Sequence, residues 1–105
     1  MRLDALALGL AILLASPLAG QERKGMVAQG RQIFSDQGCY GCHTLGIVGT
    51  PIAPDLSRVG LRYRESDLVR WLADPSGQEP TRHMPKIQLS RAELLALAAF
   101  LASLE

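Results

Sequence analysis

The sequence predicts a small all-α fold in which three main helices are joined by long loops. Apolar residues recur at helical spacing in three stretches, residues 24–37, 66–74 and 90–104. Between them, Gly and Pro punctuate residues 44–63 and 76–89, and no stretch there shows the alternation of a strand. Long structureless loops are uncommon in a small domain unless they have a function. We therefore expect these loops to wrap around a large cofactor.

The first helix and its two successors each carry a sequence signal. Gly30 is costly inside a helix, by about 1 kcal/mol relative to Ala, so it predicts a close approach of another backbone. Gly38 is suited to cap the end of the first helix. Pro75 stops the second helix. The third begins with a capping box, in which Ser90 and Glu93 each satisfy a free backbone N–H.

The amino-terminal residues have the layout of a secretory signal peptide. An uncharged apolar run from Ala5 to Ala15 is followed by small residues and Pro17, and charges resume at Glu22. A membrane span needs about 20 apolar residues, and this run is shorter. We expect residues 1–19 to be a cleaved signal peptide, which predicts an exported, periplasmic protein. The alternative is an uncleaved anchor that would hold the protein at a membrane.

The rest of the chain, residues 20–105, is long enough for one domain. With 48% hydrophobic residues the chain has a globular composition, and its formal net charge of +1 includes no basic run that would indicate nucleic-acid binding. So small a domain buries limited apolar surface and usually needs a staple such as a disulfide, metal or cofactor. A disulfide between two cysteines three residues apart would constrain the unfolded chain little.

The same two cysteines belong to the motif Cys39-Tyr-Gly-Cys42-His43, which is the C-x-x-C-H pattern of c-type haem attachment. Thiols at positions i and i+3 share one face of a helical turn and can add to two vinyl groups of one porphyrin. The histidine that follows is then placed to reach the iron, for which histidine is the usual proximal ligand. We predict one haem c, attached through Cys39 and Cys42, with His43 bound to its iron.

Two other uses of the cysteine pair are weaker interpretations. A dithiol redox pair usually occurs in a strand–helix context, which this sequence lacks. A structural zinc site would need further ligands, and no second cysteine pair is present.

Three side chains could bind the iron on the other face of the haem. Met84 lies in the segment Thr81-Arg-His-Met-Pro85, a proline-bounded loop that can present a side chain to a metal. His83 in the same segment is an alternative ligand. Met26 belongs to the first helix, where it is expected to face packing or solvent. We therefore favour Met84 as the second iron ligand.

Together these features resemble the class I cytochrome c family over the whole chain beyond the signal peptide. Gly30-x-x-x-Phe34 resembles the family's first helix, and the segment from Leu97 to Leu101 resembles its last helix. Ala53-Pro54-Asp55-Leu56 is similar to the family's Gly-Pro-x-Leu segment, although Ala53 replaces the glycine. There the proline carbonyl accepts the N–H of the proximal histidine, so the resemblance implies that Pro54 orients His43.

The resemblance also assigns residues to the wall of the haem crevice. Trp71 and Leu72 would line it near the second iron ligand. Arg62 lies where some members place an arginine near a haem propionate, and Arg58 and Arg64 are equally available for that role.

These assignments predict a one-electron carrier with a positive potential, not an enzyme, with unidentified redox proteins as donor and acceptor. Arg82 and Lys86 could steer an acidic partner. A second candidate function is a small cytochrome subunit of a larger respiratory or sulfur-oxidising enzyme complex. A third, a gas sensor or peroxidase-like enzyme, requires an open or displaceable sixth coordination site on the iron.

Overall fold

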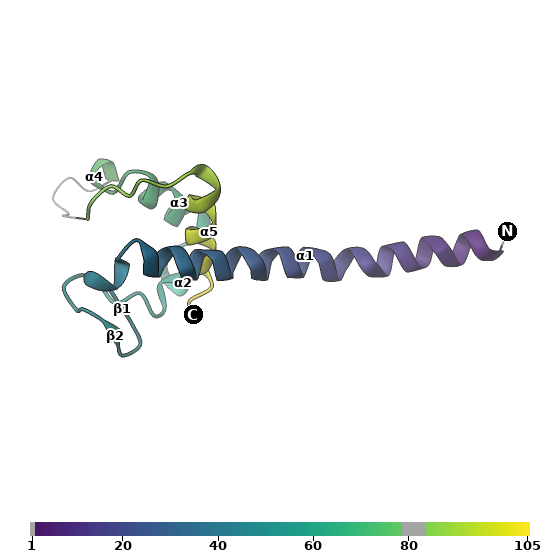
Figure 1. Ribbon diagram of the computed structural model, residues 1–105, viewed down its shortest axis with the longest axis horizontal. Coiled ribbons are helices and arrows are strands. Elements are labelled where there is room, and N and C mark those ends of the chain that lie inside the picture. The colour runs from purple at the N-terminus through teal and green to yellow at the C-terminus, as the bar shows by residue number, and fades with distance from the viewer. Residues whose placement is uncertain (1, 79–83) are drawn as a thin grey trace.

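The computed structural model describes residues 2–78 and 84–105, and these are mostly helical (Figure 1). This confirms the predicted all-α class. In chain order the elements are α1 (Arg2–Asp36), the 3₁₀ turn η1 (Cys39–Gly41), strands β1 (Thr44–Leu45) and β2 (Val48–Gly49), α2 (Val59–Arg62), α3 (Glu65–Ala73), α4 (Pro75–Gln78) and α5 (Arg91–Ala102).

Helix α1 is much longer than the sequence predicted. It begins at Arg2 instead of residue 24 and continues through Pro17. Ala and Leu, which have high helix propensity, dominate the residues before this proline and follow it directly as Leu18 and Ala19, which favours continuation of the helix. The amino-terminal part projects away from the other elements and gives the molecule a length of 67 Å against 29 and 24 Å in the other directions (Figure 1). Within the described part of the chain, no helix combines the length and apolarity needed to cross a membrane.

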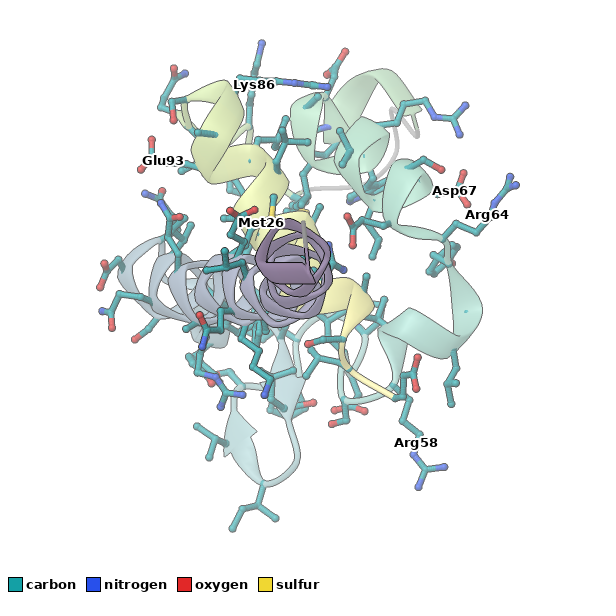
Figure 2. The ribbon with its side chains drawn as sticks, turned by 90° about the vertical axis from the view of Figure 1, so that its right-hand side faces the viewer. Met26, Arg58, Arg64, Asp67, Lys86 and Glu93 are labelled. Carbon is teal, nitrogen blue, oxygen red and sulfur yellow. The ribbon has the colours of Figure 1, made fainter. Side chains whose placement is uncertain are left out.

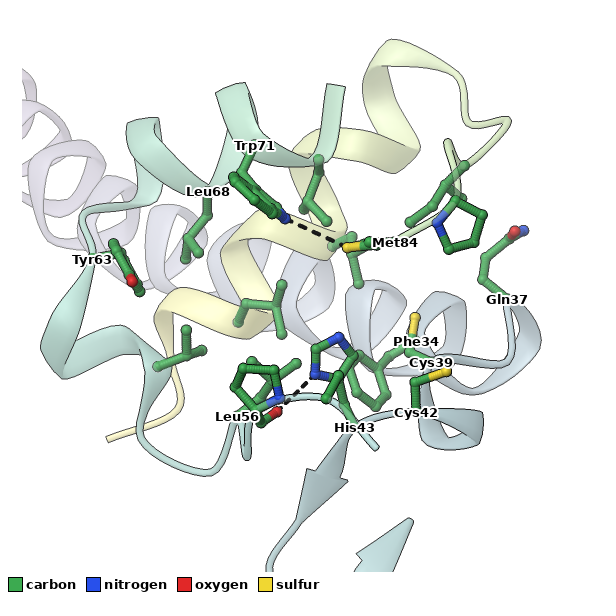
Figure 3. Close-up of a pocket in the computed structure, with 18 of the residues that line it drawn as sticks. Phe34, Gln37, Cys39, Cys42, His43, Leu56, Tyr63, Leu68, Trp71 and Met84 are labelled. Atoms are coloured by element: carbon green, nitrogen blue, oxygen red, sulfur yellow. Dashed lines mark hydrogen bonds between the residues drawn. The ribbon is translucent and has the colours of Figure 1, made fainter. Parts of the chain in front are cut away.

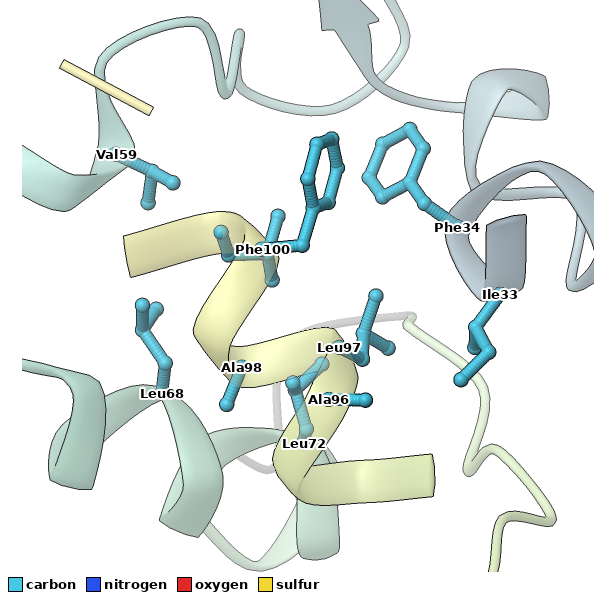
Figure 4. Close-up of a cluster of buried hydrophobic side chains, with 10 residues drawn as sticks. Ile33, Phe34, Val59, Leu68, Leu72, Ala96, Leu97, Ala98 and Phe100 are labelled. Atoms are coloured by element: carbon cyan, nitrogen blue, oxygen red, sulfur yellow. The ribbon is translucent and has the colours of Figure 1, made fainter. Parts of the chain in front are cut away.

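The hydrophobic core lies where α5 packs against both α1 and α3 (Figure 4). The rings of Phe34 and Phe100 meet edge to face with their centroids 5.7 Å apart. The close approach predicted at Gly30 is confirmed, because a Cβ there would overlap the carbonyl oxygen of Ala96. The buried side chains of the core are Ile33, Phe34, Val59, Leu68, Leu72, Ala96, Leu97, Ala98, Phe100 and Leu101.

The start of α5 and the end of α1 use the residues that the sequence indicated. The Ser90 hydroxyl accepts the N–H of Glu93 at 3.1 Å, and the Glu93 carboxylate accepts the N–H of Ser90 at 2.9 Å, so the predicted capping box is confirmed. The Asp67 carboxylate accepts the N–H of Arg64 at the start of α3. Gly38 follows α1 with a φ of 74°, a left-handed conformation that suits glycine.

Both segments predicted as structureless loops contain short elements. Residues 44–63 hold the antiparallel pair β1–β2 and the single-turn helix α2, and residues 76–89 hold the end of α4. Two-residue strands are too short to show the alternation by which a strand is recognised in a sequence. The hairpin turns at Gly46 and closes at Gly49, both with positive φ.

Candidate haem-binding site

The predicted site residues surround a single cavity of about 990 Å³, a volume at the upper end of the range for cofactor pockets (Figure 3). Its walls come from α3 and α5 on one side and from the segment between Cys39 and Leu56 on the other. All eight side chains that the sequence singled out line it: Cys39, Cys42, His43, Pro54, Arg62, Trp71, Leu72 and Met84.

The two cysteines are held on the cavity wall by a tight turn. The N–H groups of Cys42 and His43 donate to the carbonyl of Cys39 at 3.3 and 2.9 Å. Tyr40 packs its ring edge-on against Phe34 of α1, with centroids 4.8 Å apart, which fixes the turn to the core. Both thiols are free, and burial raises the pKa of the Cys39 thiol.

The His43 imidazole is oriented by a backbone carbonyl. Its Nδ1 lies 2.7 Å from the Pro54 oxygen. Because a carbonyl oxygen can only accept, Nδ1 must carry the proton, which leaves the lone pair on Nε2. Figure 3 shows this second ring nitrogen turned into the cavity. This is the usual arrangement of a histidine that binds a metal.

Met84 faces His43 from across the cavity (Figure 3). The indole Nε1–H of Trp71 donates to the Met84 sulfur at 3.4 Å, which is an ordinary length for a bond to sulfur. Leu72, next to Trp71 on α3, is buried in the core. Met26 packs against the core and is not part of the cavity lining that the structure describes. His83 and Arg82 lie outside the described residues.

The three candidate arginines separate clearly in space. Arg62 lines the cavity, and its Nη2 donates to the Asp55 carbonyl at 2.9 Å. Arg58 and Arg64 point away from the molecule (Figure 2), and Arg64 pairs with Asp67. Lys86 is also exposed, and its role toward a partner stays a prediction.

Sequence reasoning missed several polar residues of the site. Tyr63, Asp67 and Arg70 line the cavity, and Arg70 donates to Asp67 at 2.7 Å. On α3, Asp67 lies three positions before Arg70 and four before Trp71, and residues at this spacing share one face of a helix. Helical spacing from Trp71 could therefore have identified Asp67 and its neighbour Arg70. Hydrogen bonds from Thr44, which follows His43 in the chain, and from Ser57 hold the pKa of the Asp55 carboxyl below its ordinary value.

The arrangement fits a covalently attached porphyrin. Two free thiols and an imidazole nitrogen share one wall, and a thioether stands opposite in a largely apolar cavity. In the described residues, no group of three or more His, Cys, Asp or Glu side chains is gathered as a metal site. The fold and the site thus define a small haem protein of the c type.

Comparison with known proteins agrees with this class. The family model for cytochrome c matches residues 27–105. The chain is 33% identical over 86 residues to cytochrome c oxidase subunit 2 of Alkalihalophilus pseudofirmus, covering 73% of this chain and 25% of that protein. It is 34% identical over 84 residues to the C subunit of nitric oxide reductase from Paracoccus denitrificans, covering 71% of this chain and 56% of that protein.

The corresponding nitric oxide reductase protein from Stutzerimonas stutzeri is 31% identical over 81 residues, covering 71% of this chain and 56% of that protein. The chain thus spans between a quarter and about half of the length of these relatives. The chain belongs to the cytochrome c family. It binds haem c covalently through Cys39 and Cys42, and its cytochrome c domain is an electron carrier.

Proposed function

We propose that this chain transfers single electrons through a haem c whose iron is bound by His43 and Met84. The observation that carries the proposal is the pair of side chains across the cavity: an imidazole whose Nδ1 is committed to Pro54, and a thioether sulfur held by Trp71. If His43 and Met84 both bound the iron, it would have no position left for a substrate. This counts against the gas-sensor and peroxidase-like alternatives, which require a vacant or displaceable position.

The haem supplies a one-electron couple between ferric and ferrous iron. The residues around it set the balance of that couple. Apolar walls such as Leu68 and Leu97 lower the local dielectric and disfavour the additional charge of the ferric state. A thioether ligand from Met84 favours ferrous iron further, so we expect a positive potential. Because Pro54 and Trp71 hold both ligand side chains, little should move when the charge changes.

The ligand assignment is tested with Met84→Ala in protein produced with haem-maturation machinery. We expect the variant to lose the weak far-red sulfur–iron band of the oxidised protein and to show a lower potential. Met26→Ala is the matched control, because Met26 packs against the core instead of lining the cavity. If Met84→Ala kept both the band and the potential, another ligand would have to be sought, with His83 as the first candidate.

For the location, we propose export to the periplasm with cleavage after residue 19. The uncharged run from Ala5 to Ala15 and the small residues after it support this. Mass spectrometry of the mature amino terminus tests it: a chain that still begins with the apolar run would favour the anchored alternative.

The second candidate function, a cytochrome subunit of a larger respiratory complex, is favoured by the comparisons. The similar proteins are named as subunits of nitric oxide reductase and of cytochrome c oxidase. Gel filtration of a mild detergent extract, followed by haem absorbance, separates the candidates. A free carrier should elute at its own small size, whereas a subunit should elute together with a larger catalytic partner.

A further inference from the structure

The backbone on both sides of His43 is tied to the segment that contains Pro54. Before His43, the Cys42 carbonyl accepts the N–H of Ala53 at 2.7 Å. After it, the Thr44 carbonyl accepts the N–H of Leu56 at 2.9 Å. The imidazole–Pro54 contact at 2.7 Å lies between these two backbone ties.

Asp55 adds a side-chain tie at the same place. Its Oδ1 accepts the hydroxyl of Thr44 at 2.7 Å and that of Ser57 at 2.8 Å, and its Oδ2 accepts the N–H of Ser57 at 3.3 Å. Its carbonyl accepts the guanidinium of Arg62 at 2.9 Å. Both the side chain and the backbone of Asp55 are therefore anchored.

The position of Asp55 in the chain gives this anchoring a consequence for His43. The Pro54 carbonyl and the Asp55 amide nitrogen belong to one planar peptide unit, so fixing Asp55 restricts the direction of that carbonyl. Hydrogen bonds to a carboxylate are stronger than those between neutral groups, which makes the Thr44–Asp55 bond the stronger kind of tie.

We propose that Asp55 is a positioning residue for the proximal imidazole: anchored by Thr44, it aims the Pro54 carbonyl at the His43 N–H. The inference rests on the proposed function, in which His43 binds the iron. A carbonyl held in place accepts a strong hydrogen bond from this N–H. The bond makes the imidazole a better electron donor, which stabilises ferric iron. Loosening the anchor should weaken that bond and shift the couple toward ferrous iron.

Thr44→Val tests the inference without changing any charge. It removes the hydroxyl and keeps the backbone tie to Leu56. We expect the equilibrium constant for reduction to rise roughly two- to tenfold, a tenfold change being about 59 mV for a one-electron couple. In the reduced protein, NMR should show faster solvent exchange of the His43 Nδ1 proton. Thr44→Ser, which keeps the hydroxyl, should restore both values.

Thr50→Val is the matched control. Thr50 lies in the same loop, and its backbone N–H donates to the His43 carbonyl. Substitution by Val keeps this backbone bond and changes only the side chain. Asp55→Asn and Asp55→Ala separate positioning from charge. The amide oxygen of Asn can still accept from Thr44, so positioning predicts a smaller shift for Asp55→Asn than for Asp55→Ala. This comparison decides the matter if Thr44→Val yields no holoprotein.

Two different failures can be told apart. If wild-type protein lacks the spectrum of a low-spin c-type haem, or His43→Ala leaves that spectrum intact, the proposed function fails. If wild type behaves as proposed while Thr44→Val leaves the potential and the proton exchange unchanged, the function stands and the role of Asp55 is refuted. Equal shifts for Asp55→Asn and Asp55→Ala, with none for Thr44→Val, would reduce Asp55 to a nearby charge.

Discussion

Each of the two side chains that face each other across the cavity has its own hydrogen-bond partner. His43 donates through Nδ1 to Pro54, and the Met84 sulfur accepts from the Trp71 indole. The two bonds act in opposite directions on the proposed iron couple. The bond made by His43 increases electron donation to the metal, whereas the bond received by Met84 withdraws electron density from the sulfur.

Trp71→Phe should therefore lower the potential. Without the indole N–H, the sulfur donates more strongly and stabilises ferric iron. We expect about a threefold change in the one-electron equilibrium constant, or roughly 28 mV at 59 mV per tenfold. Redox titration with optical detection measures it.

The same substitution made in Met84→Ala protein is the control, because a double-mutant cycle isolates the pair. The effect of Trp71→Phe should disappear when the sulfur is absent. An effect that persisted would assign the shift to altered solvent access to the cavity.

For single residues, the sequence predicted those that act together within a short stretch of chain and missed those whose partners are distant in the chain. The attachment motif is local, with five consecutive residues specifying thiols and imidazole together, so Cys39, Cys42 and His43 could be placed in advance. The Thr44–Asp55 bond joins residues eleven positions apart and depends on how the hairpin folds back. Asp55 was visible only as the variable position of a resembling segment, which carried no indication of its contacts.

At the scale of elements, the crossing of α1 and α5 organises the core. The crossing is close because Gly30 has no side chain: a Cβ there would overlap the Ala96 carbonyl oxygen and lie 2.6 Å from the Phe100 Cβ. The Ala96 oxygen belongs to the backbone and the Phe100 Cβ is the first atom of its side chain, so neither atom can rotate away. The helices themselves would have to separate.

Gly30→Ala should destabilise the holoprotein by about 1–3 kcal/mol, even though Ala favours helix by about 1 kcal/mol. Gly25→Ala is the matched control on the same helix, because a Cβ there would meet nothing within 4 Å. That variant should be as stable as wild type or slightly more stable. Urea unfolding followed by circular dichroism compares them. Equal behaviour of the two variants would mean that the crossing can relax at little cost.

Prediction of the elements depended on how their ends are signalled. α5 could be predicted because Ser90 and Glu93 mark its start within four residues. The start of α1 was misplaced because the amino-terminal residues were assigned to a signal peptide and not to the first helix, whereas the helix continues through Pro17. The hairpin was missed because its strands have two residues each, and tertiary ties to residues 50–56 hold it in place.

At the scale of the whole molecule, α1 and α3 both pack against α5, and an ion pair between Arg23 and Glu65 bridges them directly. The Arg23 guanidinium donates twice to the Glu65 carboxylate, with Nη1 and Oε2 3.1 Å apart. Glu65 begins the helix that carries Trp71 and Leu72 into the cavity. The pair thus connects the long amino-terminal helix to one of the helices that form the cavity wall.

Arg23→Gln should lower the stability of the holoprotein by up to about 1 kcal/mol, since both partners are more than a third exposed and solvent screens them. The hydrogen bond from Arg23 holds the pKa of Glu65 below its ordinary value of 4.5. A carboxylate whose pKa is lowered by folding stabilises the fold fully at pH values above its pKa in the unfolded chain. This stabilisation is lost as the pH falls through its pKa in the folded protein. The difference between wild type and Arg23→Gln in urea unfolding should therefore be constant near neutrality and shrink below about pH 4.5. Lys24→Gln is the control, because it removes the adjacent exposed charge and should show no such pH dependence. A similar pH profile for both variants would assign the effect to net charge and not to the ion pair between α1 and α3.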